Sequence, residues 1–283
     1  MAYAKTAASE EGNPAPRRSL ASDTHKMLAH VEDGVGWITF NQPDKRNAVS
    51  YDMWVSIPPI VVSFAADPEV RVVVMQGAGE KAFVAGADIS EFEEKRSSQE
   101  QIEVYDGAME AAHEALRSLE KPLIAMIRGF CIGGGLAIAL TADLRISADD
   151  GQFGVPAARL GLGYGYDGVK ELMDIVGPAF TKEIFFTGRR FSAAEASGMG
   201  LVNRVVPVAE LEGVVGQLAQ QIAANAPLTV GAVKAAVNEG VKDPDRRDLA
   251  RVEALVAQCF ASQDYQEGRR AFMEKRPPRF KGQ

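Results

Sequence analysis

The sequence contains few of the residues that build metal centres and disulfide frameworks. Its 283 residues include two cysteines, Cys131 and Cys259, and three histidines, His25, His30 and His113. The histidines have no metal-like spacing with either cysteine, so we expect no metal ion. Two cysteines are too few for a disulfide framework and suit a reducing compartment, so we expect a cytoplasmic protein.

Long apolar runs and an excess of basic residues are also absent. No apolar run is long enough to cross a bilayer, and the first residues mix both charges without an apolar core, so we expect no signal peptide. The formal net charge is −7 and the sequence pI is about 5.2. This balance disfavours nucleic acid as a partner. We expect a globular protein that binds neither a membrane nor a nucleic acid.

The order of the expected elements indicates an α/β protein. Strand-like and helix-like runs alternate to about residue 205, and only helical patterns follow. Residues 1–24 are rich in Ala, Ser, Pro and charge without periodicity, so we expect a disordered extension there. We expect the folded core over residues 25–206 and a helical region over residues 207–283.

Two local signals allow sharper predictions near the N-terminal end of this core. Asp33-Gly34 lies between two apolar runs and predicts a β-hairpin. Pro58-Pro59 lies inside the helical pattern from about residue 50 to 65, and it predicts a break or kink because proline cannot donate a helical hydrogen bond.

The most distinctive segment carries three consecutive glycines, Gly133, Gly134 and Gly135. An apolar run precedes them and a helix-like run follows, so we expect a strand, a glycine turn and a buried helix. A helix start presents free backbone N–H groups, and glycine allows a ligand to approach them closely. The turn is therefore suited to a negative or polarised oxygen, although three glycines could equally serve a tight turn or close packing.

A second glycine-containing element, from Phe83 to Ile89, strengthens the functional interpretation. Two strand ends that each deliver a backbone N–H to one pocket would form an oxyanion hole. Neither element has the lysine of a phosphate-binding loop or the GxGxxG spacing of a dinucleotide site. Chemistry through a polarised carbonyl therefore fits better than nucleotide binding.

Six segments in this order resemble successive signatures of the enoyl-CoA hydratase/isomerase (crotonase) superfamily. They are the two glycine elements, Asp143–Ile146, Gln152–Pro156, Leu201–Val206 and Glu267–Arg276. The resemblance runs from about residue 27 to the C-terminus. It implies a crotonase-like α/β fold, which is a spiral of ββα units with a helical C-terminal trimerisation region. It also implies trimers, often paired as hexamers, and a coenzyme A thioester as substrate without a further cofactor.

The resemblance also assigns roles to residues by position. It implies that the backbone N–H groups of Ala87 and Gly134 bind the thioester oxygen and that residues 85–90 line the CoA passage. The basic side chains it places near the CoA phosphates could equally be solvated surface. The CoA-binding set that it implies is Lys45, Ala85, Ala87, Asp88, Ile89, Gly134 and Lys275.

Two glutamates that the resemblance predicts are absent. Hydratases of this superfamily carry one glutamate two residues after the last glycine of the turn and another just after the proline of the QFGxP motif. This chain has Ala137 and Ala157 there. Hydration of an enoyl thioester needs a base for water and an acid for the α-carbon, and alanine supplies neither. We therefore expect other groups to provide the acid or base.

Asp167 is the nearest acidic candidate, in a glycine- and tyrosine-rich loop. Some isomerases and dehalogenases of the superfamily place a carboxylate in this loop, about two residues before Asp167. Aspartate just before a helix is also a good N-cap. Tyr164 and Tyr166 are candidate hydrogen-bond donors, and they could equally pack at a pocket mouth.

Three further residues have a chemical and a structural interpretation. Cys131 could be a nucleophile, but a cysteine beside an apolar strand is more often a small buried hydrophobe. Arg159 could anchor a carboxylate or be structural. His113 has acidic neighbours on its expected helix, so we expect it to be solvated.

The sequence therefore predicts an acyl-CoA-processing enzyme, a lyase or isomerase of hydratase type that stabilises a thioester enolate. Isomerisation, C–C cleavage and hydration remain open. One alternative is an acyl-CoA-binding protein that has lost catalysis, which the two alanines favour. Another is a CoA-thioester hydrolase.

Overall fold

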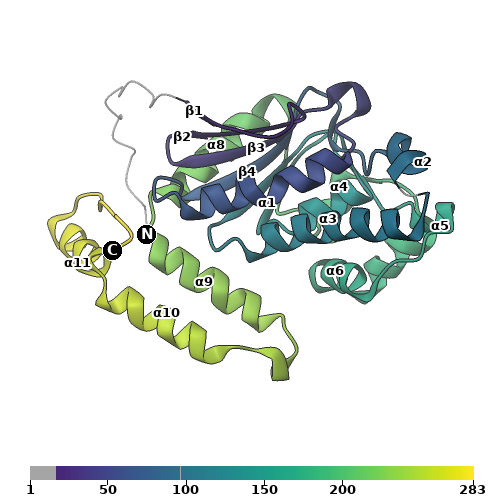
Figure 1. Cartoon of the computed structure of the whole chain (residues 1–283). Coiled ribbons are helices and arrows are strands. Elements are labelled where there is room, and N and C mark those ends of the chain that lie inside the picture. The colour runs from purple at the N-terminus through teal and green to yellow at the C-terminus, as the bar shows by residue number, and fades with distance from the viewer. Residues whose placement is uncertain (1–16, 96) are drawn as a thin grey trace.

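A computed structural model describes residues 17–95 and 97–283 of the chain, which form two β-sheets surrounded by helices (Figure 1). The larger sheet has the strand order β1-β2-β3-β4-β6-β8-β11. Its strands are β1 (Arg18–Leu20), β2 (Met27–Glu32), β3 (Val35–Phe40), β4 (Val72–Gly77), β6 (Leu123–Ile127), β8 (Leu144–Ala148) and β11 (Arg204–Val206). The first three strands are antiparallel and the rest are parallel.

The smaller sheet has the order β10-β9-β7-β5. Its strands are β5 (Ala82–Val84), β7 (Phe130–Ile132), β9 (Gln152–Gly154) and β10 (Phe191–Ser192). The chain contributes β4 then β5, β6 then β7, and β8 then β9, and each pair adds one strand to either sheet before a helix follows. This repetition is the spiral of ββα units that the sequence predicts.

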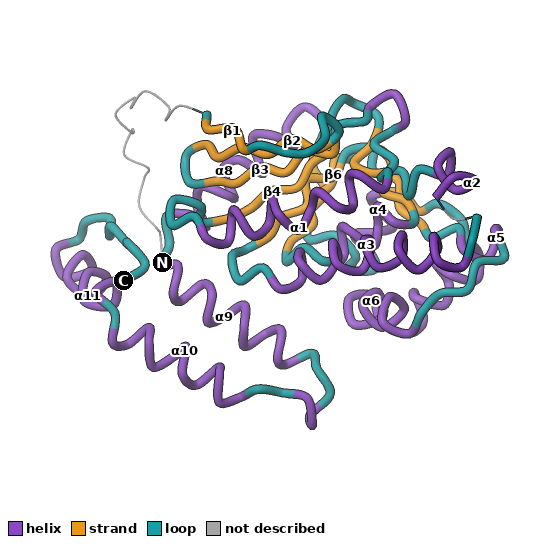
Figure 2. The backbone as a smooth tube through the Cα atoms, viewed as in Figure 1, coloured by secondary structure: helices purple, strands orange, loops and turns teal. Residues whose placement is uncertain are grey.

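The helices lie around the two sheets (Figure 2). They are α1 (Tyr51–Ala66), α2 (Phe92–Lys95), α3 (Gln99–Ser118), α4 (Gly134–Leu140), α5 (Ala157–Leu160), α6 (Tyr166–Thr187), α7 (Ala193–Gly198), α8 (Leu211–Ala223), α9 (Pro227–Gly240), α10 (Leu249–Ala261) and α11 (Gln263–Glu274). Short 3-10 turns are η1 (Pro43–Lys45), η2 (Ile89–Glu91), η3 (Val208–Glu210) and η4 (Pro244–Arg246).

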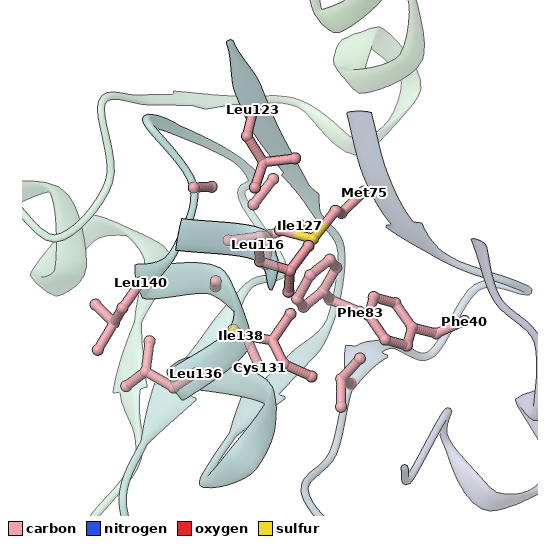
Figure 3. Packing of buried hydrophobic residues seen from close by; sticks show 14 of the residues in the cluster. Phe40, Met75, Phe83, Leu116, Leu123, Ile127, Cys131, Leu136, Ile138 and Leu140 are labelled. Carbon is pink, nitrogen blue, oxygen red and sulfur yellow. The ribbon is translucent and has the colours of Figure 1, made fainter. Parts of the chain in front are cut away.

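The main hydrophobic core lies between the two sheets, α1, α3 and α4. Phe40 and Phe83 meet edge to face there with ring centroids 5.7 Å apart, and Ile138 of α4 packs near them (Figure 3). A smaller core on the other face of the larger sheet joins Val72 and Val74 of β4 to Val215 and other residues of α8. The burial of β4 on both faces explains its nearly unbroken apolar sequence.

Two local predictions have different outcomes. The hairpin is confirmed, because Asp33 and Gly34 connect the antiparallel strands β2 and β3 with φ angles of 48° and 79°. The predicted break at Pro58-Pro59 is wrong, because α1 continues through both prolines. Ile57 before them and Ile60 after them are both buried in the main core, so packing stabilises the helix on both sides of the prolines.

The ends of the folded core differ from the expected boundaries. Residues 1–16 of the expected extension lie outside the described residues, but residues 18–20 are not loose, since β1 pairs with β2. At the other end, α8 packs on the larger sheet and belongs with the core. Only α9, α10 and α11 extend away from it (Figure 1). Among the described residues, no helix is long and apolar enough to span a membrane.

Candidate active site

The three consecutive glycines connect β7 to α4, and each is required for a different reason. Gly133 has a φ of 54° and a ψ of −117°, a conformation that favours glycine. A side chain on Gly135 would overlap the carbonyl oxygen of Val84. At Gly134, the first residue of α4, an added Cβ would meet only ordinary contacts. Close packing and the turn thus explain Gly133 and Gly135, and neither explains Gly134.

The backbone nitrogen of Ala87 lies close to Gly134. Val49 makes hydrogen bonds to the residues on both sides of Ala87. Its N–H donates to Gly86 O at 2.8 Å, and its carbonyl oxygen accepts from Asp88 N at 2.9 Å. Successive peptide groups of an extended segment point to opposite sides, so the Ala87 N–H points away from Val49. The Ala87 nitrogen is 3.6 Å from the position that a Cβ on Gly134 would take.

The structure therefore brings together the two backbone donors that the sequence singles out. Within the described part of the chain, neither the Ala87 N–H nor the Gly134 N–H donates to a protein acceptor. Gly134 also lies at the positive end of α4, which favours a negative oxygen. In the described part of the chain, two backbone donors without a protein acceptor thus lie close together at a helix start.

Asp88 fixes the loop that carries Ala87. The residue is 4% exposed, and its side chain accepts hydrogen bonds from Lys45 Nζ at 2.7 Å, Ser90 Oγ at 2.6 Å and Gln42 Nε2 at 3.2 Å. Burial alone would raise the pKa of Asp88, but the hydrogen bonds from Lys45 and Ser90 outweigh it and the pKa lies below its usual value. Lys45 and Asp88 thus stabilise the loop as an ion pair.

Of the other residues in the expected CoA-binding set, Ala85 and Ile89 lie near Ala87, whereas Lys275 lies elsewhere. Ala85 is half-buried and Ile89 is 74% exposed, and both lie on the Ala87 loop. Lys275 ends α11 with a left-handed φ of 54°. In Figure 1, α11 lies at the opposite end of the molecule from α4. One chain therefore does not bring Lys275 to the other residues of this set.

The two alanines flank the same turn. Ala137 is half-buried on α4, one helical turn after Gly134, and Ala157 is 5% exposed as the first residue of α5. Neither position has a group that can move a proton. Any acid or base must come from another element.

Asp167 and Tyr166 lie on the surface at the start of α6. The helix begins at Tyr166 with Gly165 as its N-cap, so the N-cap interpretation of Asp167 is wrong. Asp167 lies instead in the first turn with an exposed side chain, and Tyr166 is 71% exposed. Tyr164 packs its ring against Phe185 at a centroid distance of 4.8 Å, which favours the packing interpretation.

The family of the chain follows from its similarity to known proteins. The family model described as enoyl-CoA hydratase/isomerase matches residues 30–283. The chain belongs to the enoyl-CoA hydratase/isomerase family. It is 35% identical to the short-chain-enoyl-CoA hydratase of Clostridium acetobutylicum and 38% identical to the crotonyl-CoA hydratase of Syntrophomonas wolfei. Each match covers 90% of this chain and 97% of the relative.

Solved structures confirm the crotonase-like α/β fold. An enoyl-CoA hydratase/carnithine racemase from Magnetospirillum magneticum superposes with a TM-score of 0.86 at 36% identity, covering 93% of this chain and 97% of that one. An enoyl-CoA hydratase from Geobacillus kaustophilus superposes with a TM-score of 0.83 at 35% identity, covering 93% and 100%. Within this family fold, the side chains around the glycine turn are the part that needs explanation.

Two sequence predictions about single residues have clear outcomes. Cys131 is fully buried, its Sγ lies 3.5 Å from Gly135 O, and burial raises the pKa of its thiol, so it is a small buried hydrophobe. The prediction that His113 is solvated is wrong. Its side chain is buried against Trp54, with ring centroids 5.3 Å apart. Burial, reinforced by the positive charge of Arg117, lowers the pKa of His113 to about 4.

The sequence analysis missed Trp54 and the pair of Arg117 and Glu171. Trp54 Cζ2 is 3.8 Å from the position of a Cβ on Gly134, so its indole packs beside the glycine turn. Arg117 Nε is 3.3 Å from Glu171 Oε1, and burial nevertheless raises the pKa of Glu171. No sequence signal connects α3 with α6 at these positions. Arg159 packs its side chain close to Gly188, which favours its structural interpretation.

Proposed function

We propose that the chain is an acyl-CoA-processing enzyme in which Ala87 and Gly134 form an oxyanion hole. The observation that carries the proposal is the 3.6 Å between the Ala87 nitrogen and the position of a Cβ on Gly134, with both N–H groups open. A thioester carbonyl oxygen between these donors would gain negative charge as its α-carbon loses or receives a proton. Such preorganised donors typically contribute 10²–10³ each in rate.

The proton chemistry requires a group other than the two alanines. We propose Asp167 as the acid or base and Tyr166 as a second hydrogen-bond donor, because both lie on the element that follows Ala157. The reaction would be hydration, isomerisation or C–C cleavage of a CoA thioester. The printed names of the relatives, short-chain-enoyl-CoA hydratase and crotonyl-CoA hydratase, make a short enoyl-CoA the first substrate to test.

The same proposal covers the coenzyme, the assembly and the location. Residues 85–90 would line the CoA passage, with Lys45 near the phosphates. We propose a homotrimer, or a hexamer made of two trimers, with contacts through α9–α11. Lys275 would then meet CoA only through the assembly, since one chain keeps it distant. We propose a cytoplasmic location, supported by the two isolated cysteines, neither of which forms a disulfide.

Two measurements on the wild-type protein test the oxyanion hole and the chemistry separately. Titration with a 2,4-dienoyl-CoA should shift its absorbance to longer wavelength, because two N–H donors polarise the conjugated carbonyl. Loss of the enoyl absorbance of crotonyl-CoA should report hydration. An unshifted dienoyl spectrum at saturation would contradict the oxyanion hole, whatever the turnover.

A binding protein without catalysis is the second candidate, and Ala137 and Ala157 are the observation that favours it. Its signature would be the spectral shift without turnover of any thioester in a panel of enoyl, β-oxo and branched acyl groups. Release of free thiol in the same panel would instead indicate a thioester hydrolase.

A further inference from the structure

Ten consecutive residues that follow the glycine turn in the fold, 158–167, are all exposed. Three of them carry large apolar side chains, since Leu160 is 73% exposed, Leu162 57% and Tyr166 71%. Contact with water is unfavourable for such side chains, and apolar groups gathered on the surface commonly mark a place that becomes covered. The exposure of this segment therefore requires an explanation.

Both ends of the segment are fixed to the folded core. Before it, Ala157 is 5% exposed, and Pro156 Cδ lies 3.9 Å from the position of a Cβ on Gly133. After it, Leu172 of α6 is buried in the main core. In Figure 1, α5 lies at the same end of the molecule as α2, which follows the Ala87 loop. The segment thus starts beside the proposed oxyanion donors.

Few contacts hold the middle of the segment, residues 160–167. Within the described part of the chain, the N–H groups of Gly163, Tyr164 and Gly165 donate to no protein acceptor. A Cβ on Gly163 or Gly165 would meet no atom within 4 Å, and neither residue has a positive φ. Neither a strained turn nor close packing explains these two glycines, so their effect is to loosen the backbone.

The packing of Tyr164 on Phe185, with ring centroids 4.8 Å apart, holds these residues in the conformation described. A segment with few hydrogen bonds and one aromatic contact costs little free energy to move. It starts at the glycine turn and has the length to fold back on it, because a chain extends by up to about 3.3 Å per residue.

We propose that residues 160–167 form a lid that closes over the acyl group of a bound CoA thioester. The inference rests on the proposed function, because it takes the thioester oxygen to lie at Ala87 and Gly134. Closure would bury the side chains of Leu160 and Leu162 and exclude water from the thioester.

The lid also gives a reason for the exposure of Tyr166 and Asp167. Both lie at its C-terminal end, and the structure leaves both on the surface. Closure would move them towards the thioester, so the open conformation has the candidate acid or base away from the site until a substrate is bound.

Hydrogen–deuterium exchange of the full-length protein tests the lid without any turnover. Peptides covering residues 158–168 would be followed in the free protein, with saturating CoA and with saturating butyryl-CoA, which has no double bond to hydrate. We expect fast exchange in the free protein and with CoA. Butyryl-CoA should slow the exchange by about tenfold or more.

Two leucine variants test whether closure buries the lid. Leu160→Ser and Leu162→Ser should each weaken butyryl-CoA binding by roughly tenfold in a calorimetric titration, the effect of losing partial burial of one leucine. Their melting temperatures should equal that of the wild type, because both side chains are exposed in the free protein. Val62→Ser is the matched control. It removes an aliphatic side chain that is 65% exposed on α1, and it should leave the affinity unchanged.

The outcomes separate the lid from the proposed function. The lid is wrong if butyryl-CoA binds and leaves the exchange of residues 158–168 unchanged, or if free CoA slows it equally. Slow exchange already present in the free protein would also overturn it, since another copy of the chain would then cover these residues. Unchanged affinity in both leucine variants contradicts the burial. If no thioester binds, the proposed function itself fails and the lid fails with it.

Discussion

The two sides of the site are built in different ways. On the side of β5, β7 and α4, steric contacts fix the backbone: Gly135 has no room for a side chain, and Asp88 is buried in hydrogen bonds that hold the Ala87 loop. On the side of α5 and α6, the candidate groups Tyr166 and Asp167 are exposed side chains.

This difference teaches where the chemistry of such a site is free to change. The proposed oxyanion donors are peptide groups, so no single side chain supplies them and they persist through most substitutions. The proposed proton-moving groups are side chains, and Ala137 and Ala157 beside the glycine turn supply none. Substitutions on the two sides should therefore have separable effects on stability and turnover.

The largest expected effect is that of Gly135→Ala. Its new methyl group would overlap the Val84 carbonyl, and a backbone oxygen cannot rotate away. We expect the free energy of unfolding to fall by about 3 kcal/mol or more. Urea unfolding would measure the loss, and stability equal to the wild type would show that α4 is free to shift.

Gly134→Ala makes the same change one residue earlier, but it should lower turnover and not stability. The new methyl group meets only ordinary contacts, 3.6 Å from Ala87 N and 3.8 Å from Trp54, but it fills the space proposed for the thioester oxygen. We expect turnover to fall by roughly 10²–10³, the value of one lost oxyanion donor. The melting temperature should stay the same or rise, because alanine favours the helix over glycine.

The variants Gly134→Ala and Gly135→Ala serve as controls for each other. If Gly134→Ala retains activity, the oxygen does not bind between Gly134 and Ala87. If it loses activity only because it unfolds, its melting temperature should fall with that of Gly135→Ala. An inactive, stable Gly134→Ala beside an unstable Gly135→Ala is the result that supports a site built from backbone.

On the side of α6, Asp167→Asn should lower turnover by about 10²-fold, the lower range for the loss of an acid or base. Stability should change by no more than about 0.5 kcal/mol, because the carboxylate is exposed. Asp174→Asn, which removes an equal charge from the same helix, should leave turnover unchanged. Equal turnover for both variants and the wild type would make Asp167 a surface residue.

The contrast between the two sides of the site also explains which of its residues could be predicted from the sequence. Glycine is informative by itself, because few backbone situations require it, so the tight turn at Gly133 to Gly135 was predictable. His113 could have been found, since it falls on the apolar stripe of α3 that contains Tyr105 and Met109. The pairing of Arg117 with Glu171 could not, because it depends on how α3 and α6 approach each other.

The smallest effect concerns the region behind Gly134, where burial of His113 links stability to pH. Its pKa is about 4 in the folded chain and about 6.5 when unfolded, so the unfolded chain binds more protons between these values. Stability should therefore rise with pH across this window and be complete above it. Glu110 opposes the shift and Arg117 reinforces it. Between pH 5 and 6.5, the contribution is at most about 2 kcal/mol.

Urea unfolding at several pH values would separate this contribution from that of His30, whose pKa burial also lowers. The stability of His113→Phe should rise less steeply between pH 5 and 6.5 than that of the wild type, and His30→Phe should account for a different part of the slope. Parallel curves for His113→Phe and the wild type would mean that water reaches the imidazole in the folded chain. The region behind Gly134 would then be accessible to water, and the backbone of β5, β7 and α4 would be less rigid than its glycines indicate.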